Sequence, residues 1–138
     1  MSARFIVAVS FIIERDGAIL MLRRSPTKDF APGRWETGSG RVESGEHPEQ
    51  AVHREVREET GLQVEIVGPV ATFHFYRGDA RDELIGITFW CRYRAGDLVA
   101  SDEHDRAIWV SPEEAKALVE SPGEVEAIDR VARNVMPR

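Results

Sequence analysis

The chain has 138 residues, a length that suits one domain with a core of its own. Acidic residues outnumber basic ones by 24 to 18, and the resulting net charge of -6 argues against a protein that binds nucleic acid polymers through a basic surface. The single cysteine, Cys91, excludes an intrachain disulfide, and no apolar segment is long enough to span a bilayer. We therefore expect one domain over residues 1–138, in a reducing, cytoplasmic setting and without membrane contact.

Two apolar runs flank the dipeptide Asp16-Gly17 near the N-terminus. They cover residues 5–15 and 18–24 and are rich in aliphatic side chains. Both residues of an Asp-Gly pair tolerate positive φ, so this pattern predicts an antiparallel hairpin. Residues 25–40, with several prolines and glycines among polar residues, predict a long loop, and long loops inside compact domains are often functional.

A helix is predicted next, because Pro48 suits a first helical position and Gly61 suits the residue after a helix end. These two residues bracket a helix of about 48–60. The rest of the chain alternates between β-branched, aromatic runs and capping signals such as Ser111-Pro112-Glu113-Glu114. It predicts strands at 64–70, 71–77, 83–94 and 108–110, the third of them central in the sheet, and helices at 111–119 and 124–135. Strands mixed with a few helices give an α/β fold class.

The predicted helix crowds three glutamates onto one side. Because an α-helix turns by about 100° per residue, Glu55, Glu58 and Glu59 fall within an arc of about 100°. One interpretation is a solvated acidic face with i,i+4 partners such as Arg54 and Glu58. The other is a site for Mg²⁺ or Mn²⁺, since these ions prefer oxygen ligands and would relieve the repulsion. A bound cation would also let an acidic protein hold a polyphosphate.

The segment from Gly40 to Leu62, GRVESGEHPEQAVHREVREETGL, resembles the Nudix box. That motif reads Gly, five residues, Glu, seven residues, Arg-Glu, an aliphatic residue, any residue, Glu-Glu, any residue, Gly and an aliphatic residue. The chain meets every defined position, with Gly40, Glu46, Arg54, Glu55, Val56, Glu58, Glu59, Gly61 and Leu62. The flanking elements are also similar to those of Nudix hydrolases.

The resemblance implies an α/β/α sandwich around a mixed sheet, and hydrolysis of a nucleoside diphosphate linked to another moiety with Mg²⁺, for which Mn²⁺ can substitute. It implies metal ligands at Glu55, Glu58 and Glu59, and a salt bridge between Glu46 and Arg54 that holds the loop against the helix. A backbone carbonyl just before the box glycine often joins the metal shell in this family. Here that residue is Ser39, where many members have glycine, which leaves the loop geometry open.

Residues outside the box complete the expected site. In the family an additional glutamate often binds metal or accepts a proton from the attacking water, and Glu103 in the loop before Trp109 matches its place. A solvated acidic loop is the alternative for Glu103. The expected catalytic set is Glu46, Arg54, Glu58, Glu59 and Glu103. The expected substrate-binding set is Trp35, which would stack on a base or pack the loop, with His74, Tyr76 and Arg24, the last at a strand end suited to phosphate contact.

The sequence specifies the substrate less closely than it specifies the reaction. ADP-ribose hydrolases of the family often carry a proline downstream of the box, where this chain has Tyr76 to Asp79, and diadenosine polyphosphate hydrolases often have a tyrosine slightly beyond Tyr76. We expect a nucleoside triphosphate that yields a monophosphate and pyrophosphate. The alternatives are those two substrates, a nucleotide sensor without turnover, and an isomerase on the same fold. The expected partners are small nucleotides, and a homodimer is left open.

Overall fold

The computed structural model describes residues 4–27, 31–99 and 101–135. Within these ranges the chain forms seven strands and three helices. The strands are β1 (Ile6–Arg15), β2 (Ala18–Arg24), β3 (Trp35–Glu36), β4 (Ser39–Arg41), β5 (Gln63–Arg77), β6 (Asp82–Ala95) and β7 (His104–Val110). The helices are α1 (Pro48–Thr60), α2 (Pro112–Leu118) and α3 (Pro122–Val135).

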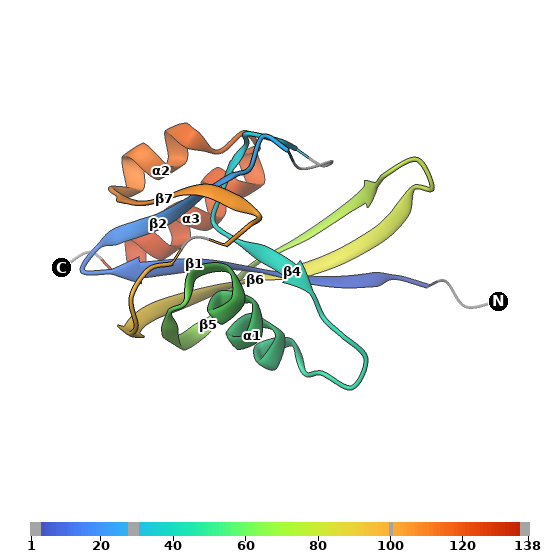
Figure 1. Ribbon diagram of the computed structural model, residues 1–138, viewed down its shortest axis with the longest axis horizontal. Coiled ribbons are helices and arrows are strands. Elements are labelled where there is room, and N and C mark those ends of the chain that lie inside the picture. The colour runs from blue at the N-terminus through green and yellow to red at the C-terminus, as the bar shows by residue number, and fades with distance from the viewer. Residues whose placement is uncertain (1–3, 28–30, 100, 136–138) are drawn as a thin grey trace.

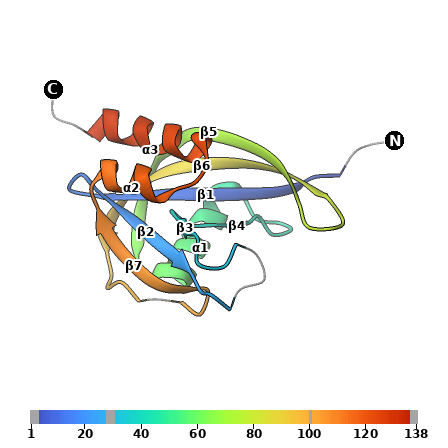
Figure 2. The same cartoon turned by 90° about the horizontal axis from the view of Figure 1, so that it is seen from above.

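One mixed sheet contains all seven strands. β1 lies in its interior, parallel to β6 and antiparallel to β2 and β4, while β5 pairs antiparallel with β6 at the edge. Helix α1 lies on one side of the sheet, and α2 and α3 lie on the other (Figures 1 and 2). The predicted α/β/α sandwich around a mixed sheet is therefore confirmed.

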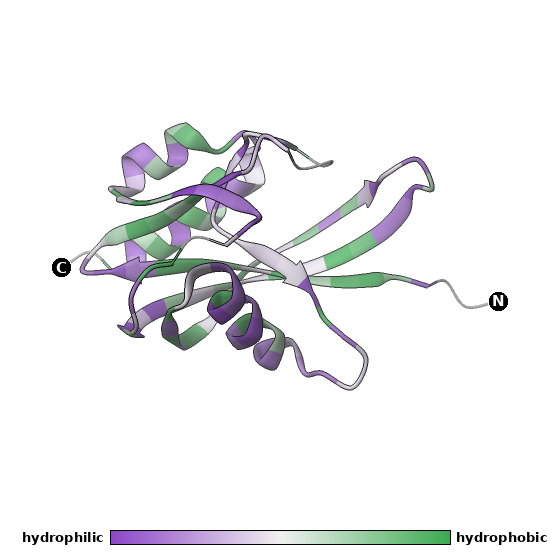
Figure 3. Cartoon of the chain, viewed as in Figure 1, coloured by the Kyte–Doolittle hydropathy of each residue, from purple (hydrophilic) through white to green (hydrophobic). Residues whose placement is uncertain are grey.

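Each face of the sheet has its own core. Along β1, Val9 and Phe11 pack toward α1 with Val56, while Ile12 packs on the other side with Ile128 of α3. This division follows from the two-residue period of a strand, which sends successive side chains to opposite faces. Figure 3 shows the apolar residues along much of β1 and β2, and polar residues on outward parts of the helices. None of the helices in the described ranges is both long and apolar enough to cross a bilayer.

Local signals placed the hairpin and α1 correctly. Asp16 and Gly17 form the turn between β1 and β2 with φ values of 51° and 86°. Helix α1 begins at Pro48, and His47 and Gln50 complete a reciprocal cap at its N-terminus. At its other end Gly61, with φ of 75°, donates its N–H to the Arg57 carbonyl at 2.9 Å.

The predicted strand boundaries were wrong in three places. Residues 64–77, predicted as two strands at 64–70 and 71–77, form one continuous strand, β5, because its pairing with β6 continues through bulges around Gly68 and Pro69. Pro69 is compatible with a strand here because β5 lies at the edge of the sheet. The predicted loop over 25–40 contains the short strands β3 and β4, and the predicted strand over 108–110 extends back to His104 as β7. β6 is an interior strand, as expected.

Candidate active site

β2 organises the site because β3 pairs along one of its edges and β7 along the other. Leu22 lies opposite Glu36 in β3 and opposite Ala107 in β7. Leu22 belongs to the core beneath α1, and alternate residues of a strand share a face, so Glu36 and Arg24 point toward α1. A bulge between Arg23 and Arg24 aligns Arg24 with His104 and turns the imidazole to that side as well.

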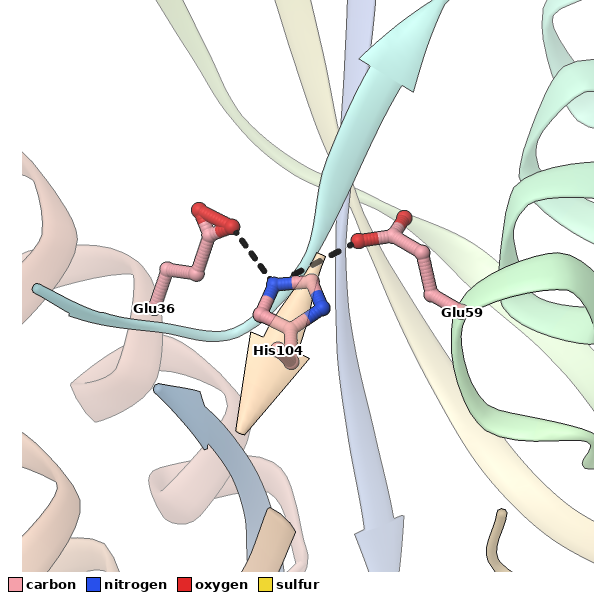
Figure 4. A group of neighbouring side chains, drawn as sticks. All are labelled: Glu36, Glu59 and His104. Atoms are coloured by element: carbon pink, nitrogen blue, oxygen red, sulfur yellow. Dashed lines mark hydrogen bonds and ion pairs between the residues drawn. The ribbon is translucent and has the colours of Figure 1, made fainter. Parts of the chain in front are cut away.

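Helix α1 approaches the same place with its acidic side. The Glu59 side chain is almost fully buried, that of Glu55 is 16% exposed and that of Glu58 is 58% exposed. Glu59 at the buried end meets His104 and Glu36, two residues that are remote from it in the chain (Figure 4). The three glutamates on this side of α1 therefore extend from the exposed surface, at Glu58, into the interior, at Glu59.

The innermost group consists of Glu36, Glu59 and His104, with ligand atoms all within 4.8 Å of one another. His104 Nε2 lies 3.0 Å from Glu36 Oε1 and 3.7 Å from Glu59 Oε1, so it hydrogen-bonds Glu36 and only faces Glu59. Arg24 also donates to Glu36 Oε1, at 3.3 Å. Arg24 therefore lies at this group, and its expected contact with phosphate stays a prediction.

Two neighbouring carboxyls have opposite electrostatic environments. Burial and the nearby charges of Glu36, Glu55 and Glu103 raise the pKa of Glu59 to about 10. Burial alone would also raise the pKa of Glu36, but the contacts with His104 and Arg24 outweigh it and lower that pKa. Both carboxylate oxygens of Glu59 are buried without a hydrogen-bond partner among the residues described. Such a carboxyl is costly in its ionised form unless a cation compensates it.

Arg54 ties α1 to the preceding loop. Its guanidinium donates to Glu46 through Nε at 2.8 Å and through Nη2 at 3.0 Å, and it also donates to the Arg41 carbonyl at 2.9 Å. The bonds that Glu46 accepts from Arg54, and then from the Glu43 backbone N–H, lower the pKa of Glu46 to about 2. Nη1 reaches Glu55 at 2.6 Å and Glu58 at 3.4 Å. The salt bridge expected between Glu46 and Arg54 is present in the structure, and it extends to two of the predicted metal ligands.

β4 passes very close to α1 at Gly40. A Cβ built on Gly40 would lie 2.2 Å from Glu55 Cδ, so a side chain there would collide with the Glu55 carboxylate. The neighbouring Gly38 has φ of 118°, and its carbonyl accepts from the Phe11 N–H at 3.0 Å. Between them Ser39 is exposed and pairs with Ser10 across the sheet. The serine therefore fits the local backbone between two glycines that close contacts require.

Glu103 precedes His104 in the loop that enters β7. Its backbone N–H donates to Ser101 Oγ at 3.2 Å and its carbonyl accepts from the Ser25 N–H at 2.8 Å, so both sides of its backbone are anchored. The carboxylate is close enough for its charge to raise the pKa of Glu59. The catalytic role expected for Glu103 stays a prediction.

Three predicted substrate contacts lie outside the acidic group, although His74 lines the same groove as Glu36. Trp35 points to the face opposite Glu36, between the guanidiniums of Arg23 and Arg106 at 5.8 and 5.6 Å, and packs against the core beneath α3. It lines a separate, open hollow. His74 and Tyr76 project from the exposed end of β5 and contact Glu83 at 2.6 and 3.5 Å. The structure does not bring Trp35 or Tyr76 to the acidic group.

Four residues near the acidic group were not predicted from the sequence: Glu36, Arg41, Arg77 and His104. Burial, followed by the charges of Arg41 and Arg24, lowers the pKa of Arg77, which also feels Glu36. Three guanidiniums therefore lie within electrostatic reach of one another at the edge of the site. Two of these residues had a signal in the sequence. Glu36 alternates with Trp35 as residues of a strand do, and His104 follows Glu103 directly before a strand.

The residues present fit a divalent cation. Glu59 offers two buried oxygens that lack partners, and Glu36 and Glu55 lie nearby with Glu58 at the surface. An all-oxygen set of this kind suits Mg²⁺ or Mn²⁺ rather than softer metals. His104 Nε2 is occupied by Glu36, which fits a positioning role for the imidazole.

Comparisons with known proteins agree with this geometry. A model of the NUDIX domain matches residues 4–131. The CTP pyrophosphohydrolase of Escherichia coli (strain K12) is 32% identical over 126 residues, which cover 91% of this chain and 90% of that protein. The nucleoside triphosphatase NudI of Salmonella schwarzengrund is 34% identical over 113 residues, 75% of this chain and 79% of that protein. The crystal structure of a MutT protein from Methanosarcina mazei Go1 superposes with a TM-score of 0.77 at 27% identity, covering 97% of both chains.

Proposed function

The chain belongs to the Nudix hydrolase family, whose enzymes cleave pyrophosphate bonds, and from this membership we propose that it hydrolyses nucleoside triphosphates to monophosphates and pyrophosphate with Mg²⁺ as its cofactor. Mn²⁺ is expected to substitute because it accepts a similar set of oxygen ligands. The names of two relatives, a CTP pyrophosphohydrolase and a nucleoside triphosphatase, support this choice of substrate.

The observation that carries the metal proposal is the buried Glu59 carboxyl. Its oxygens have no hydrogen-bond partner among the described residues, and the charges of Glu36, Glu55 and Glu103 act on it. A buried carboxyl that has no hydrogen-bond partner and feels three further acidic groups is suited to bind a cation. We propose Glu55, Glu58 and Glu59 as ligands, with Glu36 adjacent and the Ser39 carbonyl as a further candidate.

The other residues have separate proposed roles. When bound, Mg²⁺ supplies charge neutralisation for the polyphosphate and a lower pKa for water. Arg24, Arg41 and Arg77 form a cationic edge that suits the phosphate oxygens of the substrate. Arg54 and Glu46 hold α1 against its loop, so that the carboxylates keep their places. Glu103 is proposed to accept the proton of the attacking water.

A substrate panel tests this function. The protein, with Mg²⁺ and again with EDTA, is incubated with nucleoside triphosphates, ADP-ribose and diadenosine polyphosphates, and the products are separated by chromatography. We expect monophosphate and pyrophosphate from the triphosphates, with Mg²⁺ only. AMP and ribose 5-phosphate as the preferred products would assign the enzyme to ADP-ribose instead. Orthophosphate as the product would place the cleavage at the terminal phosphate and contradict the proposal, and no turnover would favour a nucleotide sensor.

A further inference from the structure

The last turn of α1 is bonded to the loop that runs from β6 to β7. The Thr60 carbonyl accepts a hydrogen bond from the Val99 N–H at 2.9 Å, and Leu98 packs against the core beneath α1. Glu59, the buried glutamate of the acidic group, directly precedes Thr60 in the chain. On the loop, Val99 lies five positions before His104, which faces Glu59 at 3.7 Å. The Thr60–Val99 contact therefore ties the loop to the helix close to the acidic group.

The Thr60 side chain shapes this end of the helix. It is fully buried, and its hydroxyl donates to the Val56 carbonyl at 2.6 Å and accepts from the Leu62 N–H at 3.1 Å. A side chain of the same shape without the hydroxyl would remove the partner of a buried N–H, which is costly away from water. The hydroxyl thus sets the path of the chain out of α1, and with it the direction of the Thr60 carbonyl.

The loop approaches the helix end too closely for side chains at the point of contact. A Cβ built on Gly96 would lie 2.8 Å from the Gly61 carbonyl oxygen, and one built on Gly61 would lie 3.0 Å from the Asp97 carbonyl oxygen. The Tyr93 hydroxyl donates to the Gly96 carbonyl at 2.9 Å and holds the loop from the side of β6. The loop therefore cannot slide along α1 without breaking these contacts.

The same loop is anchored a second time where it enters β7. Ser101 Oγ accepts from the Glu103 N–H at 3.2 Å and lies 3.5 Å from His104 Nδ1, and the Ser101 carbonyl accepts from the His104 N–H at 3.3 Å. Val99 and Ser101 are only two positions apart. A displacement of the loop at Val99 is therefore passed on to Glu103 and His104 instead of being absorbed between them.

We propose that Thr60 is a positioning residue for the hydrolysis: its hydroxyl keeps the loop that carries Glu103 and His104 in a fixed place relative to Glu59. The Nudix box accepts any residue at this position, so the motif itself does not account for a buried threonine. A misplacement of about 1 Å, caused by a change away from the chemistry, can lower a rate about a hundredfold. The inference rests on the proposed function in that the acidic group is the centre of the reaction.

The first experiment separates the hydroxyl of Thr60 from the shape of its side chain. Thr60→Val keeps the shape and removes both hydrogen bonds of the hydroxyl, whereas Thr60→Ser keeps the hydroxyl and removes a methyl group. Val131→Ala, in the core beneath α3, is the control for a loss of stability alone. Melting temperature, kcat and KM are measured for each protein with CTP and Mg²⁺, and NMR spectra of the metal-free proteins follow the imidazole resonances of His104.

We expect Thr60→Val to lower kcat at least tenfold with KM changed less than twofold, and to shift the His104 resonances. Thr60→Ser and Val131→Ala should stay within threefold of the wild type in kcat with unshifted His104 resonances, although Val131→Ala melts at a lower temperature. A smaller fall for Thr60→Val, or unshifted His104 resonances in it, overturns the inference. An equal fall for Thr60→Ser or for Val131→Ala does so too, because shape or stability would then explain the loss.

Gly96→Ala perturbs the same contact from the loop, so that the test does not depend on the folding of Thr60→Val. Its Cβ would press on the Gly61 carbonyl, whereas Gly17→Ala, the control, has a similar positive φ and nothing within 4 Å of its Cβ. We expect a fall in kcat of at least tenfold for Gly96→Ala alone, and equal effects of both substitutions contradict the inference. If the wild type hydrolyses no triphosphate, the proposed function fails, and the His104 resonances still decide whether Thr60 positions the loop.

Discussion

The Glu59 carboxyl makes the stability of the metal-free protein sensitive to pH. Its pKa is about 10 in the folded chain, mainly because of burial, and about 4.3 when unfolded. The folded state therefore holds a proton that the unfolded state releases, and the free energy of unfolding must fall as pH rises between these values. We expect the wild type in EDTA to lose melting temperature from pH 5 to pH 9.

Glu59→Gln is the matched variant, because it keeps the shape and removes the ionisation. In EDTA it should be more stable than the wild type at pH 9, and the two proteins should converge toward pH 5. Its kcat with Mg²⁺ should fall at least about a hundredfold, a loss of about 3 kcal/mol in transition-state stabilisation. If the melting temperatures of the two proteins changed equally with pH over this range, the ionisation of Glu59 would be normal in the folded state and the prediction would be wrong.

Glu103 and Asp105 are two loop carboxylates whose environments predict different effects. Asp105 accepts two hydrogen bonds from Arg23, at 2.8 and 2.7 Å, so both of its carboxylate oxygens already have a partner. Glu103 acts electrostatically on Glu59. We expect Glu103→Gln to lower kcat at least tenfold with little change in KM, and to flatten the acidic limb of the pH profile, while Asp105→Asn stays near the wild type. Equal, small effects of both substitutions would remove Glu103 from proton transfer.

Residues of the box could be assigned from the sequence, whereas Glu36 and His104 could not. The three box glutamates lie on one helix, so their proximity follows from helical geometry alone. Glu36 and His104 meet Glu59 only because β3 and β7 pair with opposite edges of β2, and because a bulge turns His104 toward α1. Neither the pairing nor the bulge has a local signature in the sequence, so the buried end of the site required the structure.

The contact between β4 and α1 depends on a residue without a side chain. A Cβ on Gly40 would lie 2.2 to 2.5 Å from three atoms of Glu55. Gly40→Ala should push the Glu55 carboxylate or the helix away, and we expect kcat to fall at least tenfold and the melting temperature to fall by about 3 °C or more. Steady-state kinetics and thermal melting measure both effects.

Gly68→Ala provides the control for this substitution. Gly68 lies in β5 with nothing within 4 Å of its would-be Cβ, and its φ is not in the left-handed region. Alanine there should leave activity and stability close to those of the wild type. If Gly40→Ala were as active as Gly68→Ala, close packing of β4 on α1 would not be what positions Glu55.

Elements were predicted well where their signals are local. The Asp16-Gly17 turn and the caps of α1 are each decided by a few adjacent residues, and both were located correctly. The strands after α1 were harder, and residues 64–77 were predicted as two strands where the structure has one that includes Gly68-Pro69. Here pairing with β6 continues on both sides of the dipeptide, and tertiary context overrides the local preference.

Across the whole molecule, the fold packs α1 against the sheet to which β3 and β7 belong, so that acidic groups from separate elements meet. Unfolding separates these elements and so relieves the repulsion between their acidic groups. A cation that binds the folded state relieves this repulsion too. The metal-free protein is thus less stable than its packing alone would allow, and cation binding should be strongly coupled to folding.

Mg²⁺ should therefore raise the melting temperature in the absence of nucleotide. At about 100 times the dissociation constant, mass action contributes about 2.7 kcal/mol, which for a domain of this size corresponds to a rise of about 8 °C. Differential scanning calorimetry against Mg²⁺ concentration measures the shift. Glu59→Gln should lose most of it, because the variant lacks the buried ligand, whereas Glu65→Gln, which removes a surface charge paired with Arg94, should retain it. An equal shift in both variants would place the stabilising cation somewhere other than the acidic group, since only one of them alters that group.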